Sequence, residues 1–197
     1  INGLAGGGGV TSTNAATLTV GNGSTATNHT GVISGPVSLI KVGGTVTQTI
    51  SGVNTWSGSV TVTAGTLQLG NAAALPSGGG RGDVTVNGTL NLAGQNASMN
   101  ALNGSGTVTN SGAACSLNTG NSNSSGTFSG VIQNGAGAVA LIKNGSGTQT
   151  LSGASTYTGT TTINAGVLRI TGSLGGAGVV TINGGTLEGS GTLAGAV

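Results

Sequence analysis

The stretch from Leu151 to Ile170 reads LSGASTYTGTTTINAGVLRI, and a similar stretch, ISGVNTWSGSVTVTAGTLQL, runs from Ile50 to Leu69. The two copies lie 101 residues apart. Counted from Gln48 and Gln149, ten of 22 aligned positions are identical. Neither copy contains an acidic residue, a histidine or a cysteine. The repeated feature is therefore a structural pattern rather than a catalytic site.

Each copy contains short segments in which apolar and polar residues alternate. Leu-polar-apolar triplets follow a glycine, and a second alternating triplet such as Val60–Val62 or Val84–Val86 precedes the glycine corner. A period of two predicts strands whose flanking residues point inward and whose middle residue points to water. The pattern thus predicts buried Leu67, Leu69, Leu90, Leu92, Leu168 and Ile170, with exposed Gln68, Asn91 and Arg169.

The composition favours many short strands joined by tight turns. The chain of 197 residues contains 43 Gly, 31 Thr, 21 Ser and 19 Asn, residue types that suit turns and strands rather than helices. Six residues carry a formal charge, namely Lys41, Arg81, Asp83, Lys143, Arg169 and Glu188. Four scattered basic residues make no phosphate-binding patch, so a nucleic acid partner is not expected. No apolar run is long enough for a membrane span, and a lone Cys115 excludes an internal disulfide.

Strand, corner, strand and loop recur at about 20 residues, as in the coils of a solenoid. A sandwich of hairpins is the rival fold. In the solenoid, however, similar segments stack on one another in parallel. We therefore predict an all-β parallel β-helix of roughly ten coils, with residues 1–197 forming one domain from two tandem units, about 1–98 and 99–197. The missing initial Met suggests a processed piece of a longer repetitive protein.

The segment LIKNGSGTQTLSGASTYTGTTTINAGVLRI, Leu141–Ile170, resembles the autotransporter passenger-associated β-helix repeat. The family's tyrosine falls at Tyr157, and its glycines fall at Gly145, Gly147, Gly153, Gly159 and Gly166. The first copy departs from the pattern, since Trp56 replaces the tyrosine and one extra residue follows Lys41. The resemblance implies a right-handed β-helix that a bacterium secretes or displays on its surface.

The residues that could support catalysis are few and scattered. Asp83 and Glu188 lie in different units, so we expect them on the order of 20 Å apart at ~4.8 Å per coil. His29, the only histidine, aligns with Phe128 and reads as a packing residue. We therefore expect no enzyme, and no catalytic, cofactor-binding or metal-ligating residue.

Three further patterns have both a functional and a structural interpretation. Arg81-Gly82-Asp83 could contact an integrin, or simply form the polar end of a glycine-rich loop. Trp56 and Tyr157 could stack on sugars, but packing over a corner is favoured. Thr-x-Thr triplets could bind ice, yet their uneven spacing means that they need not line up on one face, and ordinary strand threonines facing solvent are favoured.

The sequence as a whole favours a structural role. We expect a stalk, fibre or adhesin shaft, extracellular or on a bacterial cell surface, that continues end to end covalently or by self-association. The alternative is a binding module for a glycan, a host surface or ice.

Overall fold

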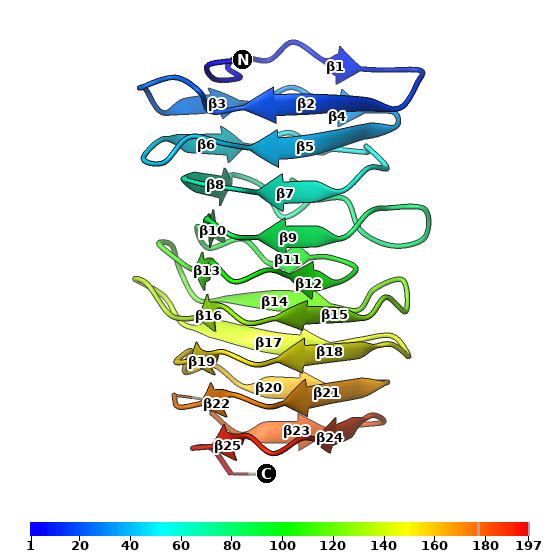
Figure 1. Cartoon of the computed structure of the whole chain (residues 1–197), viewed down its shortest axis with the longest axis vertical. Coiled ribbons are helices and arrows are strands. Elements are labelled where there is room, and N and C mark those ends of the chain that lie inside the picture. Colours follow the sequence, from blue (N-terminus) through cyan, green and yellow to red (C-terminus); the bar gives the residue numbers. More distant parts are fainter. Residues whose placement is uncertain (177, 197) are drawn as a thin grey trace.

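The computed structural model describes residues 1–176 and 178–196. These residues form 25 short strands and no helix (Figure 1). All strand pairs are parallel, and each strand pairs with one in the next coil: Leu168 pairs with Leu187, 19 residues later, and Val60 pairs with Val84, 24 residues later. The chain is thus the predicted parallel β-solenoid, with about nine turns. Its right-handed sense stays a prediction, which agrees with the usual hand of parallel crossover connections.

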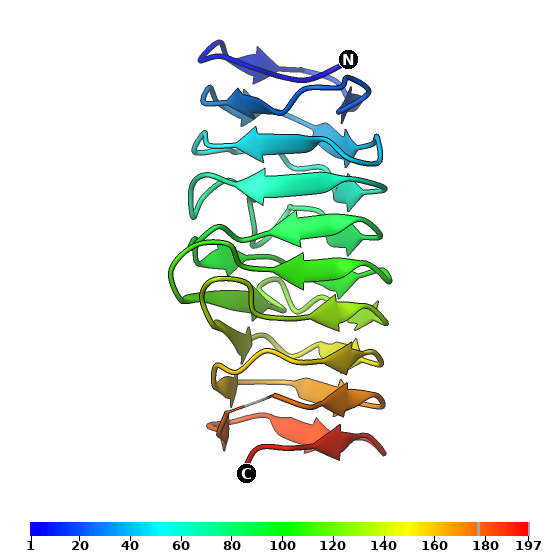
Figure 2. The ribbon, with the colours of Figure 1, turned by 90° about the vertical axis from the view of Figure 1, so that its left-hand side faces the viewer.

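The strands stack into three columns, which we call faces 1, 2 and 3 (Figures 1 and 2). Face 1 contains β2 (Ala16–Val20), β5 (Val37–Lys41), β7 (Val60–Val62), β9 (Val84–Val86), β12 (Leu102–Asn103), β15 (Gly126–Phe128), β18 (Thr148–Leu151), β21 (Val167–Ile170) and β24 (Thr186–Glu188). A parallel bridge from Gly104 to Phe128 joins the upper and lower parts of this face.

The other two faces complete each coil. Face 2 contains β3 (Thr27–His29), β6 (Thr47–Ile50), β8 (Thr66–Leu69), β10 (Thr89–Asn91), β13 (Thr107–Thr109), β16 (Val131–Ile132), β19 (Ala154–Ser155), β22 (Ser173–Leu174) and β25 (Thr192–Leu193). Face 3 contains β1 (Val10–Thr11), β4 (Ile33–Ser34), β11 (Ala97–Ser98), β14 (Cys115–Thr119), β17 (Val139–Lys143), β20 (Thr161–Ile163) and β23 (Val180–Ile182).

Face 3 lacks regular strands between β4 and β11, and Asn54 bridges part of that interval. Its side chain accepts a hydrogen bond from the Ile33 backbone N–H at 2.7 Å and donates one to the Ala74 carbonyl at 2.9 Å. The Asn54 side chain is therefore buried without an unpaired polar atom. A side-chain amide here supplies the contacts that a strand backbone supplies elsewhere on this face.

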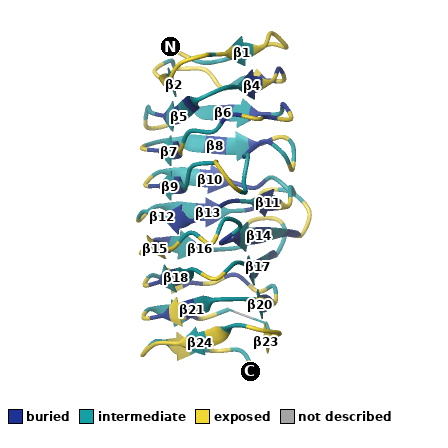
Figure 3. Ribbon diagram, turned by 90° about the vertical axis from the view of Figure 1, so that its right-hand side faces the viewer, coloured by how far each residue is buried: buried dark blue, intermediate teal, exposed yellow. Residues whose placement is uncertain are grey.

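A single apolar core runs along the axis inside the three faces. Figure 3 shows that buried residues occur in one coil after another along the solenoid. The six residues predicted to be buried, Leu67, Leu69, Leu90, Leu92, Leu168 and Ile170, are all at most 3% exposed. Side chains of the same kind stack between coils, as Leu67 does on Leu90 and Val62 on Val86. Burial of each leucine contributes roughly 1.5–3 kcal/mol.

The predicted exposure of the middle residues was correct for Arg169 and wrong for Asn91. Asn91 is 8% exposed, and Gln68 is half-buried. The Asn91 amide donates to Gln68 Oε1 and Ser111 Oγ, while its oxygen accepts from the Ala93 and Ser111 N–H groups. Neighbouring coils thus cover a side chain that the alternation alone directs to water.

The two copies of the repeated stretch lie on different faces. In the first copy Thr47–Ile50 forms β6 on face 2, whereas in the second copy the equivalent Thr148–Leu151 forms β18 on face 1. The reason is that the offset of 101 residues does not contain a whole number of coils. Equivalent side chains of the two copies therefore point in different directions around the axis.

Candidate functional site

The structure does not bring Asp83, Glu188 and His29 together. Asp83 precedes β9 and Glu188 ends β24, and the two strands are five coils apart on face 1. At ~4.8 Å per coil this is on the order of 24 Å. His29 ends β3 on face 2 and is 1% exposed. Among the described residues, no cluster of three or more His, Cys, Asp or Glu is positioned to hold a metal ion.

The side chains of Arg81 and Asp83 form contacts within the fold. Arg81 Nη1 donates to the carbonyls of Thr55 and Trp56. Asp83 Oδ1 accepts from the Ala101 backbone N–H at 3.1 Å. Both residues are half-buried. These contacts support the interpretation of Arg81–Asp83 as a loop fixed to adjacent coils.

Trp56 and Tyr157 are 1% and 0% exposed, respectively. The Tyr157 hydroxyl lies 2.7 Å from Thr161 Oγ1, and burial raises the pKa of Tyr157 to about 12. Stacking on a sugar needs an exposed ring face. The burial of both rings supports the packing interpretation.

Lys41 and Lys143 are buried at equivalent positions of the two copies, a feature that the sequence analysis missed. The Lys143 ammonium donates to the carbonyls of Asn144, Gly145 and Ala165 at 2.6, 2.8 and 3.2 Å. Burial lowers the pKa of both lysines from the usual value. The alternation of the strand could have revealed this burial. Lys41 and Lys143 each lie two residues after an inward-facing leucine, Leu39 or Leu141, so their side chains also point inward. Each ammonium joins the carbonyls of two successive coils.

The Thr-x-Thr triplets are divided among the faces, with Thr17–Thr19 on face 1 and Thr107–Thr109 on face 2, whereas other threonines do line up along face 2. Thr47, Thr66, Thr89 and Thr107 occupy the same register position on four successive coils. Thr49, Gln68, Asn91 and Thr109 form a second row beside them. Face 2 thus presents an uncharged array of hydroxyl and amide groups over these coils.

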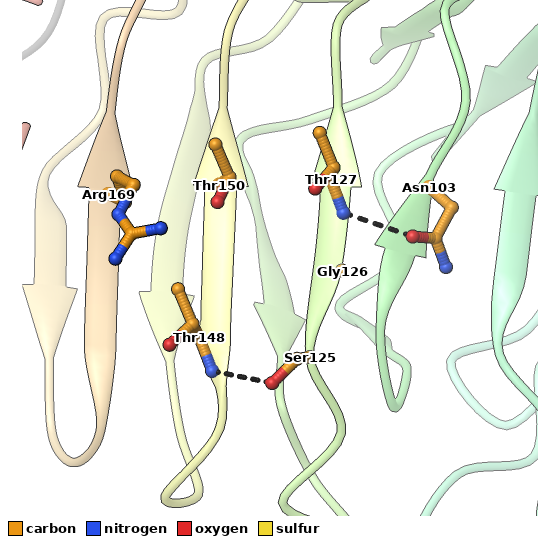
Figure 4. A pocket seen from close by; sticks show the side chains of 7 residues that line it. All are labelled: Asn103, Ser125, Gly126, Thr127, Thr148, Thr150 and Arg169. Carbon is orange, nitrogen blue, oxygen red and sulfur yellow. Dashed lines mark hydrogen bonds between the residues drawn. The ribbon is translucent and has the colours of Figure 1, made fainter.

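Face 1 carries a shallow groove of about 310 Å³ across β12, β15, β18 and β21 (Figure 4). One row of side chains follows the axis, from Asn103 through Thr127 and Thr150 to Arg169, and a second row contains Ser125 and Thr148. Asn103 Oδ1 accepts the Thr127 N–H at 3.0 Å, and Ser125 Oγ accepts the Thr148 N–H at 2.9 Å. These bonds hold two lining side chains in place.

Arg169 extends over the end of this groove and pairs with Glu188. Its Nε and Nη2 lie 2.6 and 2.5 Å from the same oxygen, Glu188 Oε1. The side chains are 49% and 39% exposed. The sequence predicted the exposure of Arg169 but not the groove, because its lining residues come from four separate coils.

The geometry defines the class of protein as an all-β parallel solenoid built from stacked repeats. The model of the passenger-associated-transport-repeat family matches residues 40–69 and 141–170. The repeats of this chain belong to the autotransporter passenger repeat family.

A relative extends this similarity beyond the two repeats. The chain is 35% identical over 156 residues to "Adhesin BmaC autotransporter" of Brucella suis biovar 1 (strain 1330). The match covers 77% of this chain and 4% of that adhesin. No solved structure matches the chain significantly. In the described part of the chain, no helix has the length and apolarity needed to cross a bilayer.

Proposed function

We propose that this chain is a shaft segment of a bacterial surface or secreted adhesin, a stiff rod that spaces or displays other parts. The observation that carries this proposal is the single apolar core that continues through the stacked coils. Where the ladder of one face is interrupted, parallel ladders on the other two faces still join the same coils. The relative's name as an autotransporter adhesin supports an extracellular, surface-associated role.

The proposed role is mechanical and not enzymatic. Asp83, Glu188 and His29 are too far apart to cooperate, and His29 is buried. About nine turns at ~4.8 Å each give a rod on the order of 40 Å long. A folded rod differs from a glycine-rich tether of equal length because its reach is proportional to the number of coils.

Small-angle X-ray scattering of the whole chain, and of two whole chains fused in tandem, tests the shaft role. A stiff shaft roughly doubles its maximum dimension, whereas a flexible chain extends by a factor of about 1.4. A Gly/Ser chain of the same two lengths is the control. Growth by the smaller factor, as in the control chain, would argue against the shaft.

A further inference from the structure

The groove on face 1 presents hydrogen-bonding groups that the fold does not use. Within the described residues, the hydroxyls of Thr127, Thr148 and Thr150 have no partner in the protein, and neither does the Asn103 amide nitrogen. The backbone of this parallel sheet is already paired. The free side-chain groups are therefore available to a ligand rich in hydroxyl and carbonyl oxygens.

The arrangement of these groups suits an extended chain. Asn103, Thr127, Thr150 and Arg169 occupy successive coils, so the row spans three coil spacings, on the order of 14 Å at ~4.8 Å each. The row runs along the axis with a second row beside it (Figure 4). A linear oligosaccharide lying along the axis meets a new set of donors at each coil.

Arg169 places a positive charge at the groove, which favours a ligand that carries a negative charge. The other basic side chains are occupied, since Lys41 and Lys143 are buried on backbone carbonyls and Arg81 donates to Thr55 and Trp56. Arg169 alone extends over the groove, and only its Nε and Nη2 contact Glu188. An exposed ion pair of this kind contributes about 0–1 kcal/mol, so a ligand carboxylate competes with it readily.

We propose that the groove binds an acidic glycan, a chain of uronic-acid units, with one carboxylate on Arg169 and sugar hydroxyls on Thr127, Thr150 and Asn103. The guanidinium holds a carboxylate through two parallel hydrogen bonds. Recognition rests on polar contacts and charge, because the aromatic rings of Trp56 and Tyr157 are buried. This binding adds to the shaft role and does not depend on it.

Titration of the whole chain with tetragalacturonic acid, followed by backbone amide NMR, tests the proposal. Maltotetraose serves as the neutral ligand. The acidic tetramer is expected to shift amides of β15, β18 and β21, and to bind more weakly as salt is added. The neutral ligand should bind at least several-fold more weakly.

Three variants in or beside the groove, with one control variant on face 2, distinguish binding at the groove from general effects of changing the surface. Arg169→Gln should weaken acidic binding on the order of two- to fivefold, and Glu188→Gln should strengthen it by removing a competing carboxylate. Thr150→Val should also weaken it, while Thr89→Val in the face 2 row is the matched control and should change nothing. The Arg169 and Glu188 side chains are 49% and 39% exposed, and Thr150 and Thr89 are half-buried, so no substitution enters the core and thermal melting verifies that each variant folds.

Equal binding of both tetramers, no effect of Arg169→Gln, or amide shifts confined to another face would overturn the proposal. Absence of binding would overturn it as well. None of these outcomes alters the scattering test of the shaft, so the two proposals fail independently.

Discussion

At the residue scale, His29 stands out as a polar group without partners in the core. It is 1% exposed, and neither ring nitrogen has a hydrogen-bond partner in the described structure. The equivalent residue of the second copy is Phe128, which is 0% exposed. A buried unpaired donor or acceptor costs about 1–3 kcal/mol. His29 therefore weakens the coil that contains it.

Exchange of these two residues tests this cost in both directions. His29→Phe should raise the free energy of unfolding by about 1–3 kcal/mol, because the unpaired nitrogens disappear. Phe128→His should lower it by a comparable amount. Urea denaturation of both variants measures the change. A loss of stability in His29→Phe would show that the imidazole has a role that its contacts do not reveal.

At the element scale, a glutamine in each copy connects its strand to the segment two coils earlier. Gln149 on β18 accepts from the Leu102 N–H at 3.1 Å and donates to the Leu102 carbonyl at 2.8 Å. Gln48 on β6 makes the same pair with Leu4, at 2.8 and 2.7 Å. In the second copy the side chain passes Gly126, where a Cβ would lie only 2.7 Å from the Leu102 oxygen. The missing side chain of Gly126 thus leaves room for the amide.

Replacement of this glutamine should leave two backbone groups unpaired. Gln149→Leu removes both bonds to Leu102 while keeping a similar volume, so we expect a loss of about 2–4 kcal/mol in unfolding free energy. Gln133→Leu, on a side chain without such bonds, is the control and should change stability by less than about 0.5 kcal/mol. Thermal and urea denaturation give both values. Equal effects of the two variants would contradict a bridging role.

At the scale of the whole molecule, the last described coil leaves apolar groups accessible. Val179 and Ile182 are 55% and 44% exposed, and Leu193 is only partly buried against the core. Strands at the end of a solenoid also have unpaired backbone groups along one edge. We propose that further coils or a second copy cover this coil, which would extend the rod along its axis.

Light scattering over a range of concentrations tests axial association. The chain expressed alone should form larger species as its concentration rises, and Leu193→Lys should suppress them because it places a charge on the apolar end. Thr89→Lys on the side of the rod is the matched control and should leave association unchanged. A monomer at every concentration, with both end coils ordered, would speak against stacking.

Much of the fold was predictable because it depends on local pattern. The alternating triplets identified the core leucines, since a period of two directs flanking side chains to one side of a strand. The candidate site was not predictable in the same way. Asn103, Thr127, Thr148 and Arg169 come from four separate coils, and nothing in their local sequence shows that they are neighbours.

The sequence by itself determined that this protein is a parallel solenoid with an axial leucine and valine core, because turn residues and alternation act over a few positions. Only the tertiary structure decided which side chains become neighbours between coils. Coil lengths vary, as the 19- and 24-residue pairings show, so the two copies face different ways. The same stacking buries Asn91, Lys41 and Lys143 and assembles the groove, because burial depends on the adjacent coil rather than on the residue's own strand.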